Sequence, residues 1–366
     1  MTAPPTAGPP AAVKGAQDGT SDSWRARAVR AVLTQRIGLL AVLLVVLVAV
    51  MLYLSSANYL TAPYNPSYMA SSLIDAVPLT MLALAELLVI VSGRGGIDLS
   101  VGSMVSVAGM VFGFGYGEWH IPLALSILVA VLVGAVLGAV NGALVAYLRF
   151  PALIATLATY YAYGSIAIVM NHQQPISTAP IQQLYSITTN VSVPGLGGVL
   201  PSIPLGIFTF LIPLLLVMWF LLRRSTFGRR LFAVGTNDVA AWWSGLGVSA
   251  TRMTTYTLAG AISGLTAVYY TAEFASARPD AGDAGNGLAL PAITIAVLGG
   301  VAITGGIGRL AGVVLAAVLI TWLDAGILLY FTGDTGTQVQ LAALGLVLLA
   351  AALLNGLTSY RYGGER

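Results

Sequence analysis

The sequence contains no cysteine, so disulfides, iron–sulfur clusters and thiolate chemistry are excluded. It has only two histidines, His120 and His172, so we expect no histidine-rich metal site, no haem and no cofactor. Lys14 is the only lysine. A phosphate-binding loop of the G-x-x-x-x-G-K-[ST] type needs a lysine beside the phosphates, so the chain does not hydrolyse ATP by that device.

Charge is also scarce. Only 8% of the 366 residues are charged, whereas an average soluble domain carries about 25%. Hydrophobic residues make up 57% of the chain, and the mean hydropathy is +0.88. This composition predicts an all-α polytopic membrane protein that lies in a lipid bilayer and does not bind nucleic acid.

Long apolar runs supply the membrane spans. A helix needs about 20 apolar residues to cross the hydrocarbon core. The third and eighth runs are short and glycine-rich, which is typical of broken or re-entrant segments. The sequence predicts about ten spans: 37–57, 68–92, 99–116, 121–147, 151–171, 205–222, 252–272, 288–304, 309–330 and 337–356.

The two ends of the chain differ from this apolar middle part. Residues 1–36 form a basic tail, and its first 23 residues are too rich in Pro, Ala, Gly, Thr and Ser to fold alone. Residues 24–36 predict either an amphipathic surface helix or a basic flank that sets topology. The transmembrane domain then covers 37–356, and a short tail covers 357–366.

Arginine placement gives the orientation, because cytoplasmic segments are enriched in Lys and Arg. If the N-terminus is inside, 15 of the 16 basic residues fall in cytoplasmic segments, and only Arg278 does not. The protein is therefore predicted to lie in the cell membrane, with both termini and segment 223–251 on the cytoplasmic side. Outer segment 172–204 is almost uncharged and is either a plain loop, a cover for a pore mouth or a contact for an external partner.

Segment 223–251 is the longest mixed polar segment between two spans. It begins with two arginine pairs, and then Gly235 to Asp238 form a run that favours turns. A short helix is expected from Val239 to Trp243, stopped by Ser244 and Gly245. A helix this short is marginal alone in water, so we expect it to dock on another surface.

Two glycine-rich stretches are similar to each other. The first glycine motif, GGIDLSVG, begins at Gly95 and Gly96, and the second, GGVAITGG, begins at Gly299 and Gly300. Internal symmetry with glycine-interrupted spans indicates a transport site, although coincidence is possible in a chain with 42 glycines. Span counting favours a parallel repeat, or an inverted one if a span is re-entrant.

Polar residues near the first motif are candidates for a translocation path. Asp98 and Ser100 precede an apolar run, so either could cap the third span, and Arg94 is close enough in sequence to pair with Asp98. Glu86 is the ionisable residue that lies deepest within a predicted span. Asn141 is expected either to make an interhelical hydrogen bond or to line the translocation path.

Two further ionisable residues, Asp75 and Asp324, lie within spans, Asp75 near an outer end. Gly134, Gly138 and Gly142 recur at the spacing of close helix packing in membranes.

Four motifs, in order, carry a family resemblance: SGRGGIDLSVGS (92–103), AVNGALVAYLRFPALIATLAT (139–159), GRRLFAVGTNDVAAWWSGLGV (228–248) and AVLGGVAITGGIG (296–308). From about residue 37 to 356 the chain resembles the membrane permease subunits of bacterial ATP-binding-cassette (ABC) sugar importers of the ribose and arabinose type. Where that family has a Glu-Leu-Asp pattern, this chain has Ala289, Leu290 and Pro291. SARPD (276–280) and LPAIT (290–294) look more like the rhamnose and autoinducer-2 permeases.

The resemblance implies a non-enzymatic subunit with three partners: a separate ABC ATPase, an extracytoplasmic sugar-binding protein, and a second permease copy or paralogue. It also implies that a short coupling helix docks on the ATPase. Ala240 and Ala241 would allow the helix to approach its partner closely, and Asn237 or Asp238 would cap it. The pair Trp242 and Trp243 would anchor the helix either in the interface with the ATPase or at the membrane surface. The positions carried over are Gly228, Arg229, Gly235, Asn237, Ala240, Ala241, Ser244 and Gly245, with Gly235 and Gly245 expected in tight turns.

The sequence thus predicts a permease that moves a monosaccharide into the cytoplasm. One alternative is the same machinery carrying another solute, such as a branched amino acid or a nucleoside. The other is an ion-coupled secondary transporter, for which Asp75, Glu86 and Asp324 are the candidate carboxylates.

Overall fold

The structure is a computed structural model that describes residues 36–191, 201–282 and 287–362, with side chains as far as residue 353. The expectations for residues 1–35 and for the last residues of the C-terminal tail lie outside this part of the chain. The prediction of an all-α membrane protein is confirmed, and the described strands are one two-residue antiparallel pair, in which Asn190 lies opposite Pro204.

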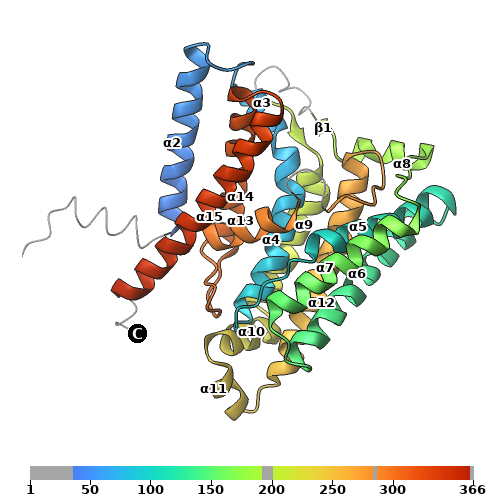
Figure 1. Cartoon of the computed structure of the whole chain (residues 1–366), viewed down its shortest axis with the longest axis vertical. Coiled ribbons are helices and arrows are strands. Elements are labelled where there is room, and N and C mark those ends of the chain that lie inside the picture. The colour runs from blue at the N-terminus through green and yellow to red at the C-terminus, as the bar shows by residue number, and fades with distance from the viewer. Residues whose placement is uncertain (1–35, 192–200, 283–286, 363–366) are drawn as a thin grey trace, which may run out of the picture.

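The elements follow one another in chain order (Figure 1). They are α2 (Arg36–Ser56), α3 (Pro66–Ser71), α4 (Leu73–Val91), α5 (Val101–Phe112), a π-helical turn (Gly113–Glu118), α6 (Leu123–Ala146), α7 (Ala152–Met170), α8 (Ala179–Gln183), a 3-10 turn (Leu184–Ile187), β1 (Asn190–Val191), β2 (Ile203–Pro204), a second π-helical turn (Ile207–Leu211), α9 (Ile212–Arg223), α10 (Thr226–Thr236), α11 (Asp238–Trp243), α12 (Val248–Glu273), α13 (Ala289–Leu298), α14 (Leu310–Tyr330) and α15 (Asp334–Tyr362).

Each of the ten expected spans contains a helix. Among the described residues, six helical segments are long and apolar enough to cross a membrane, or seven if α9 and α10 are one span bent by 67°. Helices α5 and α13 are too short for that test, and the threonine-rich α12 is long enough but less apolar. The count of ten spans therefore stays a prediction.

Helix α4 lies at the centre of the molecule. In its most apolar stretch 83% of the residues are buried, compared with 11% in α2 at the periphery. It contacts α12, α13 and α14, and its aliphatic side chains form the middle of the largest core cluster. Thr80 and Glu86 on α4 are consequently held inside protein, whereas the apolar surface of α2 remains available to lipid.

Helices α6 and α12 pack closely against each other, and glycines allow it. A Cβ atom at Gly134 would overlap the Gly260 carbonyl oxygen, and one at Gly138 would overlap that of Tyr256. The backbones approach so closely only because neither glycine has a side chain. The close packing predicted from the four-residue glycine spacing is confirmed.

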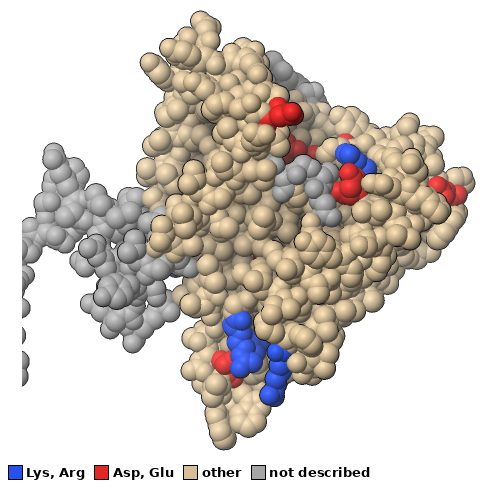
Figure 2. Space-filling view, in the orientation of Figure 1, with Lys and Arg blue, Asp and Glu red and all other residues tan. Residues whose placement is uncertain are grey.

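The two ends of the molecule differ in character. Figure 1 shows α10 and α11 at the lower end, to which the start of α2 and the end of α15 also point, and α3, β1 and α8 at the upper end. On the face shown in Figure 2, most basic side chains gather at the lower end and most acidic ones at the upper end. The described part of segment 172–204 packs on the upper helix ends, because Ile176 pairs with Ala277 and Ile181 is buried.

Candidate functional site

Segment 223–251 is largely helical, which the sequence reading missed. Helix α10 begins at Thr226, where the Ser225 Oγ accepts a hydrogen bond from the Gly228 N–H at 3.1 Å. Gly228 is required here because a Cβ atom would overlap the Leu222 carbonyl oxygen. Arg229 is exposed on the same helix.

The expected short helix is present as α11. The Asn237 Oδ1 accepts the Ala240 N–H at 2.9 Å, so Asn237 is the N-cap, as the sequence indicated. The Ser244 Oγ donates to the Ala240 carbonyl oxygen at 2.9 Å, and Gly245 follows with φ +79°, a conformation that favours glycine. The expected glycine turn after α11 is confirmed.

Gly235 has a different role from the one predicted. It lies inside α10 and makes no turn, since helical geometry continues to Thr236. A Cβ atom at Gly235 would overlap the Val91 carbonyl oxygen and lie 2.6 Å from the Gly306 nitrogen. The residue is glycine because three backbone segments meet at this point.

Those three segments are α10, the end of α4 and the end of the second glycine motif. The Gly306 N–H donates to the Val91 carbonyl oxygen at 3.0 Å. A Cβ atom at Gly305 would lie 2.5 Å from the Cα atom of Gly93, which lies two residues before the first glycine motif. We call this contact of Gly93, Gly235, Gly305 and Gly306 the glycine junction. It places both glycine-rich stretches directly against α10.

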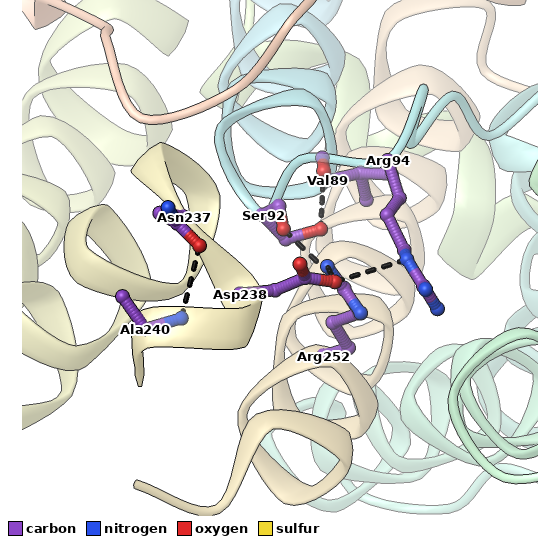
Figure 3. Close-up of polar contacts among 7 residues, drawn as sticks. All are labelled: Val89, Ser92, Arg94, Asn237, Asp238, Ala240 and Arg252. Carbon is purple, nitrogen blue, oxygen red and sulfur yellow. Dashed lines mark hydrogen bonds and ion pairs between the residues drawn. The ribbon is translucent and has the colours of Figure 1, made fainter. Parts of the chain in front are cut away.

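Asp238, the first residue of α11, is the second link to the membrane helices. Its Oδ2 lies 2.9 Å from the Arg94 Nε and 3.1 Å from the Arg252 Nη2, as Figure 3 shows. The Arg252 side chain is only 7% exposed, and its Nε also donates to the Ser92 carbonyl oxygen at 3.3 Å. One carboxylate thus joins α11 to α12 and to the loop after α4.

The electrostatics of this bridge favour an ionised Asp238. Burial alone raises the pKa of Asp238, but the hydrogen bond and charge of Arg252, together with the charge of Arg94, outweigh it and hold that pKa below its ordinary value. The expected pairing of Arg94 with Asp98 is wrong. Gly93, Arg94 and Gly95 all have positive φ, and this turn directs the arginine to α11.

Asp98 instead belongs to a fully buried polar network. The Asn141 Nδ2 donates to Asp98 Oδ1 at 3.2 Å and to the Ser100 Oγ at 2.7 Å, and the Ser100 Oγ donates to Asp98 Oδ1 at 2.6 Å. The Asp98 N–H reaches the Glu86 Oε2 at 3.4 Å. The interhelical hydrogen bond expected of Asn141 is confirmed, whereas the Ser100 side chain makes no capping hydrogen bond to α5.

The four path candidates Glu86, Asp98, Ser100 and Asn141 are therefore brought together, and none is exposed. They join α4, the start of α5 and α6, and they line neither of the two cavities described for this chain. Two atoms, the Glu86 Oε1 and the Asn141 Oδ1, have no hydrogen-bond partner. The network holds the interrupted third span in place in this conformation.

The four glycine candidates are placed apart from that network. Gly95 adopts φ +65° in open space, and a Cβ atom at Gly96 would lie 2.5 Å from the Val89 carbonyl oxygen. Gly299 packs on α14, because a Cβ atom there would lie 2.7 Å from the Val313 Cα, and Gly300 lies against the Arg36 side chain. The motifs therefore bend and pack the backbone.

Comparison with known proteins supports the family resemblance. The family model described as "Branched-chain amino acid transport system / permease component" matches residues 68–354. The autoinducer 2 import system permease protein LsrD of Photorhabdus temperata is 31% identical over 334 residues, which are 90% of this chain and 94% of that protein.

Two further relatives are not named as autoinducer 2 permeases. The ribose import permease protein RbsC of Bacillus subtilis is 34% identical over 267 residues, covering 71% of this chain and 76% of that protein. The probable ABC transporter permease protein YphD of Escherichia coli is 33% identical over 287 residues, or 78% and 81%. The chain therefore belongs to the branched-chain amino acid transport system permease family, and it is a non-catalytic, multi-pass membrane subunit of a bacterial ABC importer.

Proposed function

We propose that this chain carries a monosaccharide into the cytoplasm, driven by ATP that a separate subunit hydrolyses after docking on α11. The exposed apolar surface of α11 carries the proposal. Val239 is 60% exposed, Trp242 61% and Trp243 77%, whereas Ala241, on the other side of the helix, is buried. A tryptophan pair on a short, capped helix is a suitable anchor, because tryptophan often dominates the energy of a protein interface.

The contacts of α10 and α11 connect the proposed docking surface mechanically to the membrane helices. A movement of α11 reaches α12 through Asp238 and Arg252, and it reaches the loop after α4 through Arg94. At the glycine junction, backbone touches backbone, so no flexible side chain absorbs a displacement of α10. In this proposal Gly228, Arg229, Asn237, Ala240, Ser244 and Gly245 shape or present the docking surface.

The orientation follows from the charges. We place α10, α11 and both termini in the cytoplasm, because basic residues are retained on the cytoplasmic side of a membrane. The sugar-binding protein then docks on the opposite end, at α3, α8 and the described part of segment 172–204. A second copy or a paralogue completes the pore, and the buried Asp98 network becomes part of the path when α5 moves.

The substrate is proposed from two observations. Two of the relatives are named for the import of autoinducer 2 and of ribose. A neutral sugar also needs no buried countercharge, which suits a chain with 8% charged residues. The description of the family names branched-chain amino acids, so leucine is the competing substrate to test.

The experiment is an uptake assay. The permease is reconstituted in proteoliposomes with its ATPase and its binding protein, and labelled D-ribose, L-rhamnose, autoinducer 2 and L-leucine are supplied outside. We expect ATP-dependent accumulation of one of the first three. Accumulation of leucine alone would overturn the sugar assignment, and uptake that follows an ion gradient without ATP would overturn the whole proposal.

A further inference from the structure

A second polar region lies near the end opposite α11. It is a cavity of about 400 Å³ between α3, α4, α12, α13, α14 and α15. Its size falls in the range of small-molecule sites, which is roughly 300–1,000 Å³. The polar side chains that line it are Tyr68, Ser71, Ser72, Asp75, Tyr270, Thr321, Asp324 and Gln340.

Carboxyl groups from two helices line this cavity, and a third carboxyl group contacts one of them. Asp75 on α4 is exposed, although it lies within a membrane helix, and its carboxyl group shares a hydrogen bond with that of Glu273 at the end of α12. Asp324 of α14 lines the cavity as well. Among the described residues, no arginine forms a salt bridge with any of these three, and no group of carboxylates or histidines is arranged to hold a metal ion.

An unsatisfied hydroxyl provides an independent sign of a ligand. Thr321 lines the cavity, is 3% exposed, and its Oγ1 has no hydrogen-bond partner. Helical threonines usually bond to the carbonyl of the preceding turn, as Thr266 and Thr294 do at 2.8 Å. A buried polar atom without a partner is costly, so a ligand that hydrogen-bonds to Thr321 would recover that free energy.

The remaining walls are aromatic and aliphatic. The rings of Tyr270 and Phe274 lie 4.6 Å apart between centroids and are tilted by 40°, and both residues line the cavity beside Leu79 and Leu328. The cavity therefore combines hydrogen-bonding groups with flat apolar surfaces. A sugar has the same two elements, a rim of hydroxyl groups and apolar C–H faces.

We propose that this cavity is the compartment in which the permease receives a polyhydroxylated ring from the outer side. The carboxyl groups of Asp75 and Asp324 accept hydrogen bonds from its hydroxyls, Thr321 supplies a further hydrogen bond, and Tyr270 and Phe274 pack against its C–H face. This inference rests on the proposed function, since it takes sugar import as given and assigns the residues that contact the substrate.

Substitutions test the assignment in the reconstituted importer. Thr321→Val removes the hydroxyl, whereas Thr321→Ser keeps it, and Asp324→Asn replaces the carboxylate. D-Ribose and L-rhamnose are the probes, and the readout is sugar moved per ATP hydrolysed. We expect about tenfold less sugar per ATP for Thr321→Val and Asp324→Asn, the effect of one lost hydrogen bond of about 1.4 kcal/mol. Thr321→Ser should recover most of the ratio that Thr321→Val loses, and the control Asp334→Asn, an exposed residue outside the cavity, should match wild type.

A labelling experiment tests the site without relying on the fold of those variants. Because the natural chain has no cysteine, Ser72→Cys places a single thiol in the cavity wall, and Ser276→Cys places one outside it. A membrane-impermeant maleimide is added to the importer with sugar-loaded or sugar-free binding protein. We expect the loaded form to slow labelling of Ser72→Cys at least twofold and to leave Ser276→Cys unchanged.

The outcomes separate the two proposals. If wild type moves sugar with ATP, but Thr321→Val and Asp324→Asn move as much per ATP and Ser72→Cys is not protected, the cavity is not the substrate compartment. If a variant fails to fold, protection of Ser72→Cys alone decides. If wild type shows no ATP-dependent uptake of any sugar, the proposed function has failed, and this inference fails with it.

Discussion

Replacing Asp238 with asparagine removes the charge that holds α11 against the membrane helices. The Arg94 side chain is 65% exposed, so its contact with Asp238 contributes less than about 1 kcal/mol. The Arg252 side chain is 7% exposed and would keep only the Ser92 carbonyl as partner, a loss of about 1–3 kcal/mol. We expect a total of about 2 kcal/mol, which is about thirtyfold in the equilibrium between docked and undocked α11.

Hydrogen exchange measures that equilibrium directly. In α11 the Ala240 N–H is bonded to the Asn237 side chain and the Ser244 N–H to the Ala240 carbonyl, so both exchange only when the helix opens. We expect peptides that cover α11 to exchange about thirtyfold faster in Asp238→Asn than in wild type, with the middle of α12 unchanged. Asp280→Asn is the control, since its contact with Arg278 is long, at 3.6 Å, and lies far from α11 in sequence. Equal exchange of α11 in wild type and Asp238→Asn would refute the bridge.

The same bridge gives a pH dependence of known sign. Because the pKa of Asp238 is lower in the folded protein, its contribution to stability is complete above the ordinary value of about 3.9. The contribution is lost only as the pH falls through the lower, folded pKa. Thermal unfolding in detergent should separate wild type from Asp238→Asn at pH 7, and the difference should shrink at acidic pH values below about 4. A difference that grows on acidification would contradict this account.

Four further substitutions have distinct expected effects. Gly235→Ala should prevent folded permease from accumulating in membranes, because its Cβ would overlap a backbone oxygen, whereas Gly245→Ala, at φ +79° in open space, should cost only about 1–2 kcal/mol in thermal unfolding. Normal yield of Gly235→Ala would argue against the glycine junction. Asn141→Leu should lower the free energy of unfolding by about 3 kcal/mol, because the buried Asp98 carboxylate loses one of its donors, and an unchanged melting temperature would contradict the network. Asn237→Ala should cost about 1 kcal/mol and speed exchange at Ala240, and this reasoning fails if exchange there stays the same.

Much of the fold is readable from the sequence because membrane helices are specified by local composition. Each of the ten apolar runs contains a helix, and the four-residue spacing of Gly134 and Gly138 marks the close pair α6 and α12. The cap at Asn237 and the glycine turn at Gly245 were equally accessible, because both act within one turn of their own helix.

The parts that were missed depend on contacts distant in sequence. Arg94 has an acidic residue four positions away, but its real partner, Asp238, lies on another element. From the sequence, Gly235 is expected in a turn. The reason for a glycine inside a helix becomes clear only from the distant backbone segments that contact it. Glu273 has no local signal of its partner, because it meets Asp75 from a distant helix. Local patterns cannot rank such pairings.

The central claim is that α11 is the surface on which the ATPase docks. A photo-crosslinking amino acid in place of Trp243, which is 77% exposed, tests it in native membranes that contain the whole importer. The matched control is the same substitution at Trp119, which is 67% exposed and follows the π-helical turn after α5. The account predicts that irradiation joins the ATPase to the permease from position 243 and not from position 119. Crosslinks from position 243 to lipid alone, with none to the ATPase, would contradict it.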